Sequence, residues 1–181
     1  MLYVGRIAPN KGVHILIQAV REISRDISVK LKIAGSYTKD YTEYYASLRD
    51  IWDETIFLGK LTREEVFREM ISADVIVCPS LAHEGFGIVP VEAMYYNGIV
   101  VATDIFEKTG AVSRDSAIIC RRGSVSALRE AITSALTMNE REREKLRARA
   151  RSYASKFTWE RHGRCVERIL FRFSRTSSLD R

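Results

Sequence analysis

Short apolar runs that end in a glycine or a polar residue recur along the chain, and segments of helical periodicity separate them. The apolar runs lie at residues 2–5, 29–35, 55–59, 74–80, 98–104 and 117–120. Apolar strands that alternate with single helices favour right-handed βαβ crossovers and a parallel sheet covered on both faces. We therefore expect an α/β protein: a Rossmann-like three-layer α/β/α domain with a mostly parallel sheet of about six strands and a helical C-terminal third.

The predicted helices begin at residues that cap helix N-termini. Thr62 and Glu65 have the spacing of a capping box. The helices of the C-terminal third each follow a serine, asparagine or threonine, and are expected at 124–137, 139–156 and 158–173. A chain of 181 residues, 46% of them hydrophobic, is about the size of one domain. We expect a single domain over residues 1–173 and a flexible tail at 174–181.

The ends of the predicted strands are rich in glycine and in polar or basic residues. They are Gly5-Arg6, Gly35-Ser36, Gly59-Lys60, the loop from Pro79 to Gly87, Thr103-Asp104 and Arg121-Arg122. Ligands of parallel α/β sheets bind outside the carboxyl ends of the strands, which meet at one edge. The sequence therefore predicts a binding site for an anion at this edge.

The segment GRIAPNKG (5–12) is the first candidate for anion binding. Gly5 ends a strand, Arg6 follows it, and Lys11 directly precedes a helix. The N–H groups at a helix start are unpaired and lie at the positive end of the helix dipole. With a guanidinium and an ammonium beside them, they form a reasonable diphosphate site. The alternative is that Arg6 and Lys11 are ordinary surface residues beside a βα turn.

The segment EGFGIVPVE (84–92) places two glycines and a proline between two glutamates. Gly85 and Gly87 let the backbone approach a ligand closely. Glu92 falls about one turn into the following helix, where a carboxylate suits the vicinal hydroxyls of a ribose, and Glu84 would face whatever lies beyond the phosphates. The alternative is one glutamate favoured by the helix dipole and one loop glutamate in solvent.

Five motifs in a fixed order carry a family resemblance. They are GRIAPNKG (5–12), FLGKL (57–61), ADVIVCPS (73–80), EGFGIVPVEAM (84–94) and VVATD (100–104). The set resembles the carboxyl-terminal, donor-binding domain of the group 1 (family 4) retaining glycosyltransferases of GT-B fold. The resemblance implies a hexosyltransferase-type enzyme that transfers a sugar from a nucleoside-diphosphate sugar to an acceptor. This chain would be its nucleotide-sugar-binding half.

The resemblance also implies which residues meet the diphosphate. Arg6 and Lys11 would neutralise it as it becomes the leaving group. Amides near Phe86, Gly87 and Ile88 would bind the diphosphate or the sugar. Preorganised cations stabilise the charge that develops on a leaving group. We therefore expect neither a metal nor another cofactor, with the nucleotide sugar as donor substrate.

The remaining implied roles concern the sugar and the nucleoside. Glu84 would contact the transferred sugar and help to set its position. Glu92 would hold the ribose hydroxyls, and the turn at Gly59, Lys60 and Leu61 would pass near the base. One departure from the family lies after VVATD, in a predicted loop (105–113) where Phe106 and Glu107 stand at places that glycines occupy in the family.

A second departure concerns the length of the chain. A GT-B transferase has two Rossmann-like domains, and Met1 directly precedes the first predicted strand. We expect that the N-terminal acceptor domain is absent from this chain, which is either an excised half or a natural half with a partner in cis or trans. The chain would then be inactive without that domain. A standalone nucleotide or sugar-phosphate binding subunit is the alternative function.

Basic residues gather in the C-terminal third. Residues 121–181 hold 16 lysines and arginines against 7 acidic residues. Such a balance can indicate a contact with nucleic acid or a peripheral contact with an anionic membrane, although solvated faces of arginine-rich helices explain it more simply. We expect no nucleic acid partner.

The cysteines form no C-x-x-C pair, which does not suit a disulfide or metal framework. The apolar runs are far shorter than the ~20 residues of a membrane span. We therefore expect a cytoplasmic protein.

Overall fold

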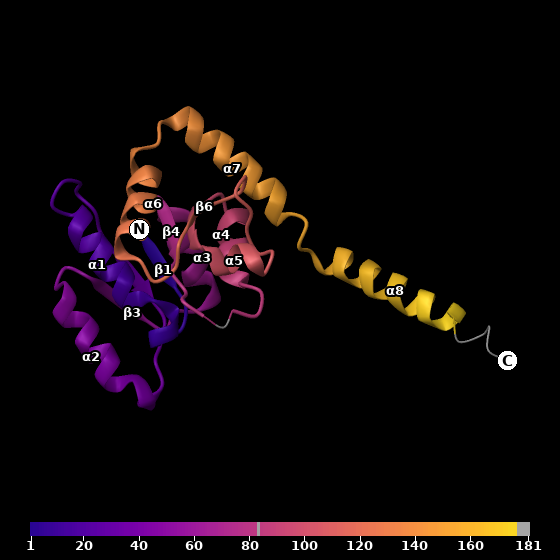
Figure 1. Ribbon diagram of the computed structural model, residues 1–181, viewed down its shortest axis with the longest axis horizontal. Coiled ribbons are helices and arrows are strands. Elements are labelled where there is room, and N and C mark those ends of the chain that lie inside the picture. Colours follow the sequence, from indigo (N-terminus) through magenta and orange to yellow (C-terminus); the bar gives the residue numbers. More distant parts are fainter. Residues whose placement is uncertain (83, 177–181) are drawn as a thin grey trace.

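The fold is built on one parallel sheet, seen in a computed structural model that describes residues 1–82 and 84–176 (Figure 1). Within these residues the sheet has six strands in the order β3-β2-β1-β4-β5-β6, and every pair is parallel. The strands are β1 (Leu2–Val4), β2 (Lys32–Ala34), β3 (Ile56–Gly59), β4 (Val75–Cys78), β5 (Ile99–Thr103) and β6 (Ile118–Cys120). The predicted fold class is confirmed.

Helices cover both faces of the sheet. They are α1 (Val13–Ile23), α2 (Thr42–Ile51), α3 (Arg63–Ser72), α4 (Ile88–Tyr95), α5 (Asp104–Lys108), α6 (Val125–Thr137), α7 (Glu140–Ala154) and α8 (Trp159–Thr176), with short 3-10 turns η1 (Pro9–Lys11) and η2 (Lys39–Tyr41). One apolar core lies under α1, α2 and α6, and a second lies under α3, α4, α5 and α7. Successive residues of β4 alternate between the two cores, since neighbouring strand side chains point to opposite faces.

The strand order reverses between β1 and β4. The first half of the chain builds outward from β1 to β3, and the second half builds outward from β4 to β6. The loops after β1 and β4 therefore leave the sheet side by side and diverge to opposite faces, because β1 is followed by α1 and β4 by α4. Such a switch point is where open α/β sheets bind ligands.

The helix-start signals read from the sequence are confirmed. Thr62 and Glu65 form a complete capping box at α3, in which the Thr62 hydroxyl accepts the Glu65 N–H and the Glu65 carboxylate accepts the Thr62 N–H. At α6 the Ser124 hydroxyl accepts the Ala127 N–H, and at α7 Asn139 Oδ1 accepts the Glu142 N–H. These bonds satisfy N–H groups that have no partner inside the helix.

Most predicted boundaries agree with the structure within two residues, and three predictions differ more. The strand expected at 29–35 begins only at Lys32. The predicted loop at 105–113 begins instead as α5, because Ile105 and Phe106 are buried in the second core and a helical turn brings both to it. The last helix continues to Thr176, beyond the predicted boundary at 173, so the predicted tail begins as helix. The rest of that predicted tail, 177–181, lies outside the described residues.

Helix α8 extends away from the sheet and its covering helices (Figure 1). Its apolar residues Trp159, Val166, Ile169 and Leu170 are exposed, Trp159 to 86%, and their spacing places them on one side of the helix. The body formed with the sheet thus ends near α7, although residues 1–173 as one domain stays a prediction. None of the described helices combines the length and apolar character that a membrane crossing requires.

Candidate functional site

The segment after β1 is fastened to the loop after β4. Gly12 has a left-handed φ of 69°, and a Cβ atom there would lie 2.2 Å from the carbonyl oxygen of Pro79. The Leu81 N–H donates to the carbonyl oxygen of Asn10 over 2.8 Å. Only glycine permits the backbone at residue 12 to come so close to Pro79. This close contact brings η1 beside the residues that lead to Glu84.

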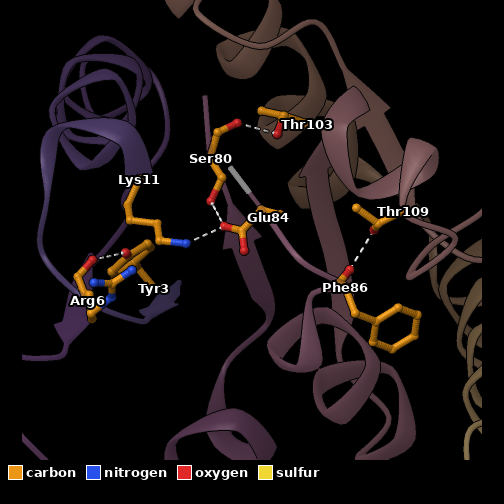
Figure 2. A network of polar contacts seen from close by, with 8 residues as sticks. All are labelled: Tyr3, Arg6, Lys11, Ser80, Glu84, Phe86, Thr103 and Thr109. Atoms are coloured by element: carbon orange, nitrogen blue, oxygen red, sulfur yellow. Dashed lines mark hydrogen bonds and ion pairs between the residues drawn. The ribbon is translucent and has the colours of Figure 1, made fainter. Parts of the chain in front are cut away.

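Lys11 and Glu84 form an ion pair across this junction (Figure 2). Lys11 Nζ lies 2.6 Å from Glu84 Oε1, and the two side chains are only 14% and 13% exposed. Ser80 Oγ donates to the same oxygen over 2.5 Å. Low exposure strengthens such a pair relative to a surface pair, because less water screens it. The carboxylate of Glu84 is therefore held by two donors at one of its oxygens.

The ion pair lines a cavity of about 140 Å³ at the switch point. The other lining residues come from the ends of β1 and β4, the start of α4, and α5: Tyr3, Val4, Gly5, Arg6, Cys78, Ser80, Gly87, Ile88, Val89, Pro90 and Phe106. The structure thus brings together six predicted site residues, which are Gly5, Arg6, Lys11, Glu84, Gly87 and Ile88. Arg6, Lys11 and the start of a helix together outweigh the single negative charge of Glu84 at this cavity, which suits an anionic ligand.

Two buried residues that line the cavity, Cys78 and Tyr3, are chemically inert. Burial, reinforced by the charge of Glu84, raises the pKa of Cys78 to about 12, so its thiol stays protonated and is a poor nucleophile. Burial likewise raises the pKa of Tyr3, whose hydroxyl donates to the carbonyl oxygen of Arg6 over 2.6 Å. The Tyr3 hydroxyl therefore fixes the backbone of Arg6 instead of titrating.

Gly87 and Phe106 define the far wall of the cavity. Gly87 has a φ of 102°, and a Cβ atom there would lie 2.5 Å from Cδ1 of Phe106. Phe106 is buried and contributes to the second core. The residue that departs from the family pattern is thus a packed wall on α5 rather than part of an open loop.

A second cavity of about 190 Å³ adjoins the first, since both are lined by Val4, Gly5 and Arg6. Its other lining residues include Gly35, Lys60 and Leu61, which follow β2 and β3. The two residues predicted to lie near a nucleotide base are therefore next to the anion cavity.

Glu92 is not among the residues that line either cavity in the described part of the chain. Its Oε1 lies 3.8 Å from Nη2 of Arg63, the first residue of α3. Partial burial raises the pKa of Glu92, and the charge of Arg63 opposes that rise. Arg63 follows Leu61, which lines the second cavity, by two residues in the sequence.

Phe86 is directed away from the anion cavity and is absent from its lining residues. Its ring centroid lies 5.1 Å from that of Phe157, in the connection between α7 and α8. Its carbonyl oxygen accepts a hydrogen bond from Thr109 Oγ1 over 2.5 Å. Of the three residues predicted to offer amides, only Gly87 and Ile88 line the cavity, because the aromatic contact draws Phe86 outward.

Sequence reasoning assigned no site role to Tyr3 and Ser80, which both line the cavity. It noted Phe106, another lining residue, only as a departure from the family. Ser80 had a readable signal, since a serine directly after a buried strand and four residues before a glutamate can reach that carboxylate. Among the described residues there is no group of three or more His, Cys, Asp or Glu side chains that could hold a metal ion.

Known proteins resemble this chain over most of its length. A family model described as glycosyl transferases group 1 matches residues 1–156. An uncharacterized glycosyltransferase of Methanocaldococcus jannaschii is 31% identical over 162 residues, which cover 88% of this chain and 44% of that protein. Glycogen synthase of Mycobacterium tuberculosis is also 31% identical, over 88% of this chain and 39% of that enzyme.

Solved structures share the fold. HepE from Anabaena, crystallised with UDP and glucose, matches 86% of this chain and 43% of its own, with a TM-score of 0.76 and 23% identity. A glycosyltransferase from Rickettsia africae matches 93% of this chain and 46% of its own, with a TM-score of 0.83 and 15% identity. The chain spans less than half the length of these four proteins. The chain belongs to the group 1 glycosyl transferases, and it corresponds to the GT-B domain predicted from its motifs.

Proposed function

We propose that this domain binds a nucleoside-diphosphate sugar as the donor of a retaining glycosyltransferase. The observation that carries the proposal is the convergence of Arg6, Lys11 and Glu84 on one cavity at the switch point, although Glu84 is 73 residues from Lys11 in sequence. The diphosphate binds beside Arg6 and Lys11, with the amides of Gly87 and Ile88 at the start of α4. The sugar lies toward Glu84 and Phe106.

The nucleoside extends from the first cavity into the second. The base lies near Lys60 and Leu61, which line the second cavity together with Arg6. The ribose lies on the side of Glu92, whose pairing with Arg63 at 3.8 Å is loose enough to yield to two ribose hydroxyls. In this arrangement the diphosphate lies beside the two cations. The nucleoside lies on the side of β2 and β3.

The charged residues suit departure of a nucleoside diphosphate. Breaking the bond between the sugar and the phosphate builds negative charge on the leaving group, and fixed cations stabilise that charge in the transition state. Lys11 has three donor positions, so it can keep Glu84 as a partner and still donate to a phosphate oxygen. On this proposal Arg6 and Lys11 supply the positive charge, and the reaction needs no metal ion.

Relatives support the donor class. HepE has been crystallised with UDP, with UDP and glucose, and with UDP-glucose. Similar curated proteins include a glycogen synthase and a phosphatidyl-myo-inositol mannosyltransferase. These names span more than one sugar and more than one acceptor, so they favour a hexosyltransferase without naming the sugar of this chain.

Transfer requires a second domain, supplied in cis or trans, and this chain alone is inactive. Two observations support this part of the proposal. The chain spans less than half of its relatives, and α8 exposes Trp159, Ile169 and Leu170 on one side. An apolar face of this kind is stable only when another surface covers it. The opposite side of α8 carries Arg161, Arg164 and Arg168, so vesicle binding is the measurement that separates an anionic membrane from a second domain at this face.

The alternative function is a standalone subunit that holds a nucleotide or sugar phosphate without chemistry. It needs the same cavity but no second domain. Contact of the basic helices with an anionic membrane would accompany either function and would show as vesicle binding that weakens steeply with salt.

Isothermal titration tests donor binding. The chain is titrated with UDP, GDP and ADP and with a glucose or mannose conjugate of each. We expect one nucleotide to bind, and Arg6→Ala to weaken it about tenfold, the cost of one hydrogen bond to a charged group. Arg25→Ala removes an exposed arginine far from the cavity in sequence and is the matched control. Failure of every nucleotide to bind would contradict the proposal.

Addition of the second domain separates the two functions. The full-length gene, or a Rossmann-like domain of about 170–200 residues encoded next to this chain, is expressed with it. Release of nucleoside diphosphate that requires both parts is expected for the transferase. Nucleotide binding with no release in the combined protein would favour the standalone subunit.

A further inference from the structure

Ser80 is a buried polar residue that the proposed chemistry does not use. It is 4% exposed and follows β4 by two residues. Its hydroxyl donates to Glu84 Oε1 over 2.5 Å, and its carbonyl oxygen accepts a bond from Thr103 Oγ1 over 2.6 Å (Figure 2). Thr103 is the last residue of β5 and is also buried. Ser80 therefore connects the end of β5 with Glu84.

The two donors to Glu84 meet a single carboxylate oxygen. Lys11 Nζ and Ser80 Oγ both contact Oε1, whereas Oε2 makes no hydrogen bond to any residue that the structure describes. A carboxylate can accept about four hydrogen bonds. Glu84 thus keeps one whole oxygen for another donor, and the residue lines the anion cavity.

The two donors differ in how strongly they define direction. The ammonium of Lys11 ends a flexible four-carbon stem with three rotatable donors, so it attracts the carboxylate without fixing its plane. The hydroxyl of Ser80 sits on a short side chain, and its backbone is tied to Thr103. Of the two, Ser80 is the one that fixes which oxygen of Glu84 is occupied.

We propose that Ser80 is a positioning residue, which holds Oε1 of Glu84 so that Oε2 stays available to accept a sugar hydroxyl. This role rests on the proposed donor function. Ser80 acts through Glu84 and does not touch the sugar. Its loss therefore weakens recognition of the sugar while leaving recognition of the nucleoside diphosphate intact.

The test compares two ligands in one protein. Binding of UDP-glucose and of UDP is measured by titration calorimetry for wild type, Ser80→Ala and Ser80→Thr. If a guanine or adenine nucleotide binds better, GDP-mannose with GDP, or ADP-glucose with ADP, is used. For Ser80→Ala we expect about a tenfold loss for the nucleotide sugar, the value of one hydrogen bond to a charged group. The loss for the free nucleotide stays within about twofold, and Ser80→Thr restores most of the sugar affinity because it keeps a hydroxyl.

Ser116→Ala is the matched control. Ser116 is also buried and hydrogen-bonded, but its partners are Ser113 atoms and it does not line the cavity. The Ser116→Ala variant reports how removal of a buried serine hydroxyl affects the fold alone. Any decrease in affinity should therefore be the same for both ligands. A crystal structure of ligand-free Ser80→Ala gives a second measure, in which the Glu84 carboxylate is expected to rotate.

Two results overturn the role of Ser80. One is an equal loss for nucleotide and nucleotide sugar in Ser80→Ala; the other is an unchanged Glu84 carboxylate in its structure. Both leave the proposed function standing, since the nucleotide still binds. If wild type binds none of the nucleotides, the proposed function fails first, and the role of Ser80 in holding a sugar fails with it.

Discussion

The two glutamates of EGFGIVPVE are eight residues apart, and the fold treats them differently. Glu84 is 13% exposed, lies 2.6 Å from Lys11 and accepts a second bond from Ser80. Glu92 is 30% exposed and lies 3.8 Å from Arg63, which is itself 75% exposed. Burial and the number of partners therefore decide whether a carboxylate is fixed or adjustable, even inside one motif.

The fixed position of Glu84 depends first on the backbone at Gly12. We expect Gly12→Ala to lower the free energy of unfolding by about 3 kcal/mol, since it adds backbone strain and a clash with the Pro79 carbonyl. Gly123→Ala is the control, because Gly123 also has a left-handed φ, 74°, but open space around its Cβ position. It should cost about 1 kcal/mol. Urea unfolding gives both values, and equal costs would show that the contact with Pro79 is unimportant.

The second prediction compares the two ion pairs directly. Lys11→Ala leaves a poorly exposed carboxylate without its cation, and we expect a loss of about 2 kcal/mol in the free energy of unfolding. Arg63→Ala removes an exposed partner and should cost less than about 0.5 kcal/mol. Chemical denaturation measures both. If the ion pair causes the larger cost of Lys11→Ala, that excess cost disappears when Glu84 is also replaced by Gln. An excess cost that remains in the Glu84→Gln protein would indicate packing of the lysine stem instead.

The third prediction concerns ligand binding at the adjustable glutamate. Glu92→Ala should weaken binding of the preferred nucleotide about tenfold, or 1.4 kcal/mol, by removing an acceptor for ribose hydroxyls. Inorganic diphosphate has no ribose, so its affinity should stay nearly unchanged. Calorimetry with both ligands checks this, with the exposed Glu54→Ala as the control. Equal losses for both ligands would place Glu92 at the phosphates.

The smallest effect is a dependence on pH. Partial burial raises the pKa of Glu92, so the folded state holds its proton more tightly than the unfolded state does. Stability from this group is therefore present at low pH and is lost as the pH rises through the raised pKa. Relative to wild type, Glu92→Gln should gain a few tenths of a kcal/mol between pH 4 and pH 7, a small value because solvent screens the group. Thermal unfolding at both pH values measures the gain, and a Glu92→Gln effect of the same size at pH 4 and pH 7 would contradict the prediction.

Patterns that are local in sequence predicted much of the fold. The period of the apolar residues and the capping box at Thr62 correctly predicted the parallel sheet and the start of α3. The rule that ligands bind at strand ends placed six predicted site residues around one cavity. Predicting these features requires only residues that are close in the sequence, together with the rule that the carboxyl ends of parallel strands share one edge of the sheet.

Contacts between distant segments were not predictable in the same way. Nothing in either segment alone indicates that Lys11 and Glu84 pair directly, or that Phe86 packs on Phe157. Helix α5 was missed because it is only five residues long, too short to show a helical pattern in the sequence. Burial of Phe106 in the second core stabilises this helix.

If no other surface covers the apolar row of helix α8, the stability of this chain should depend on protein concentration. Water is a poor solvent for a row formed by Trp159, Val166, Ile169 and Leu170. Two copies that lay these rows together would remove both from water, and their measured stability would then rise with the amount of protein present. A shorter version that stops at Ala154 carries the whole sheet without that row, and its melting temperature should be the same in dilute and concentrated samples.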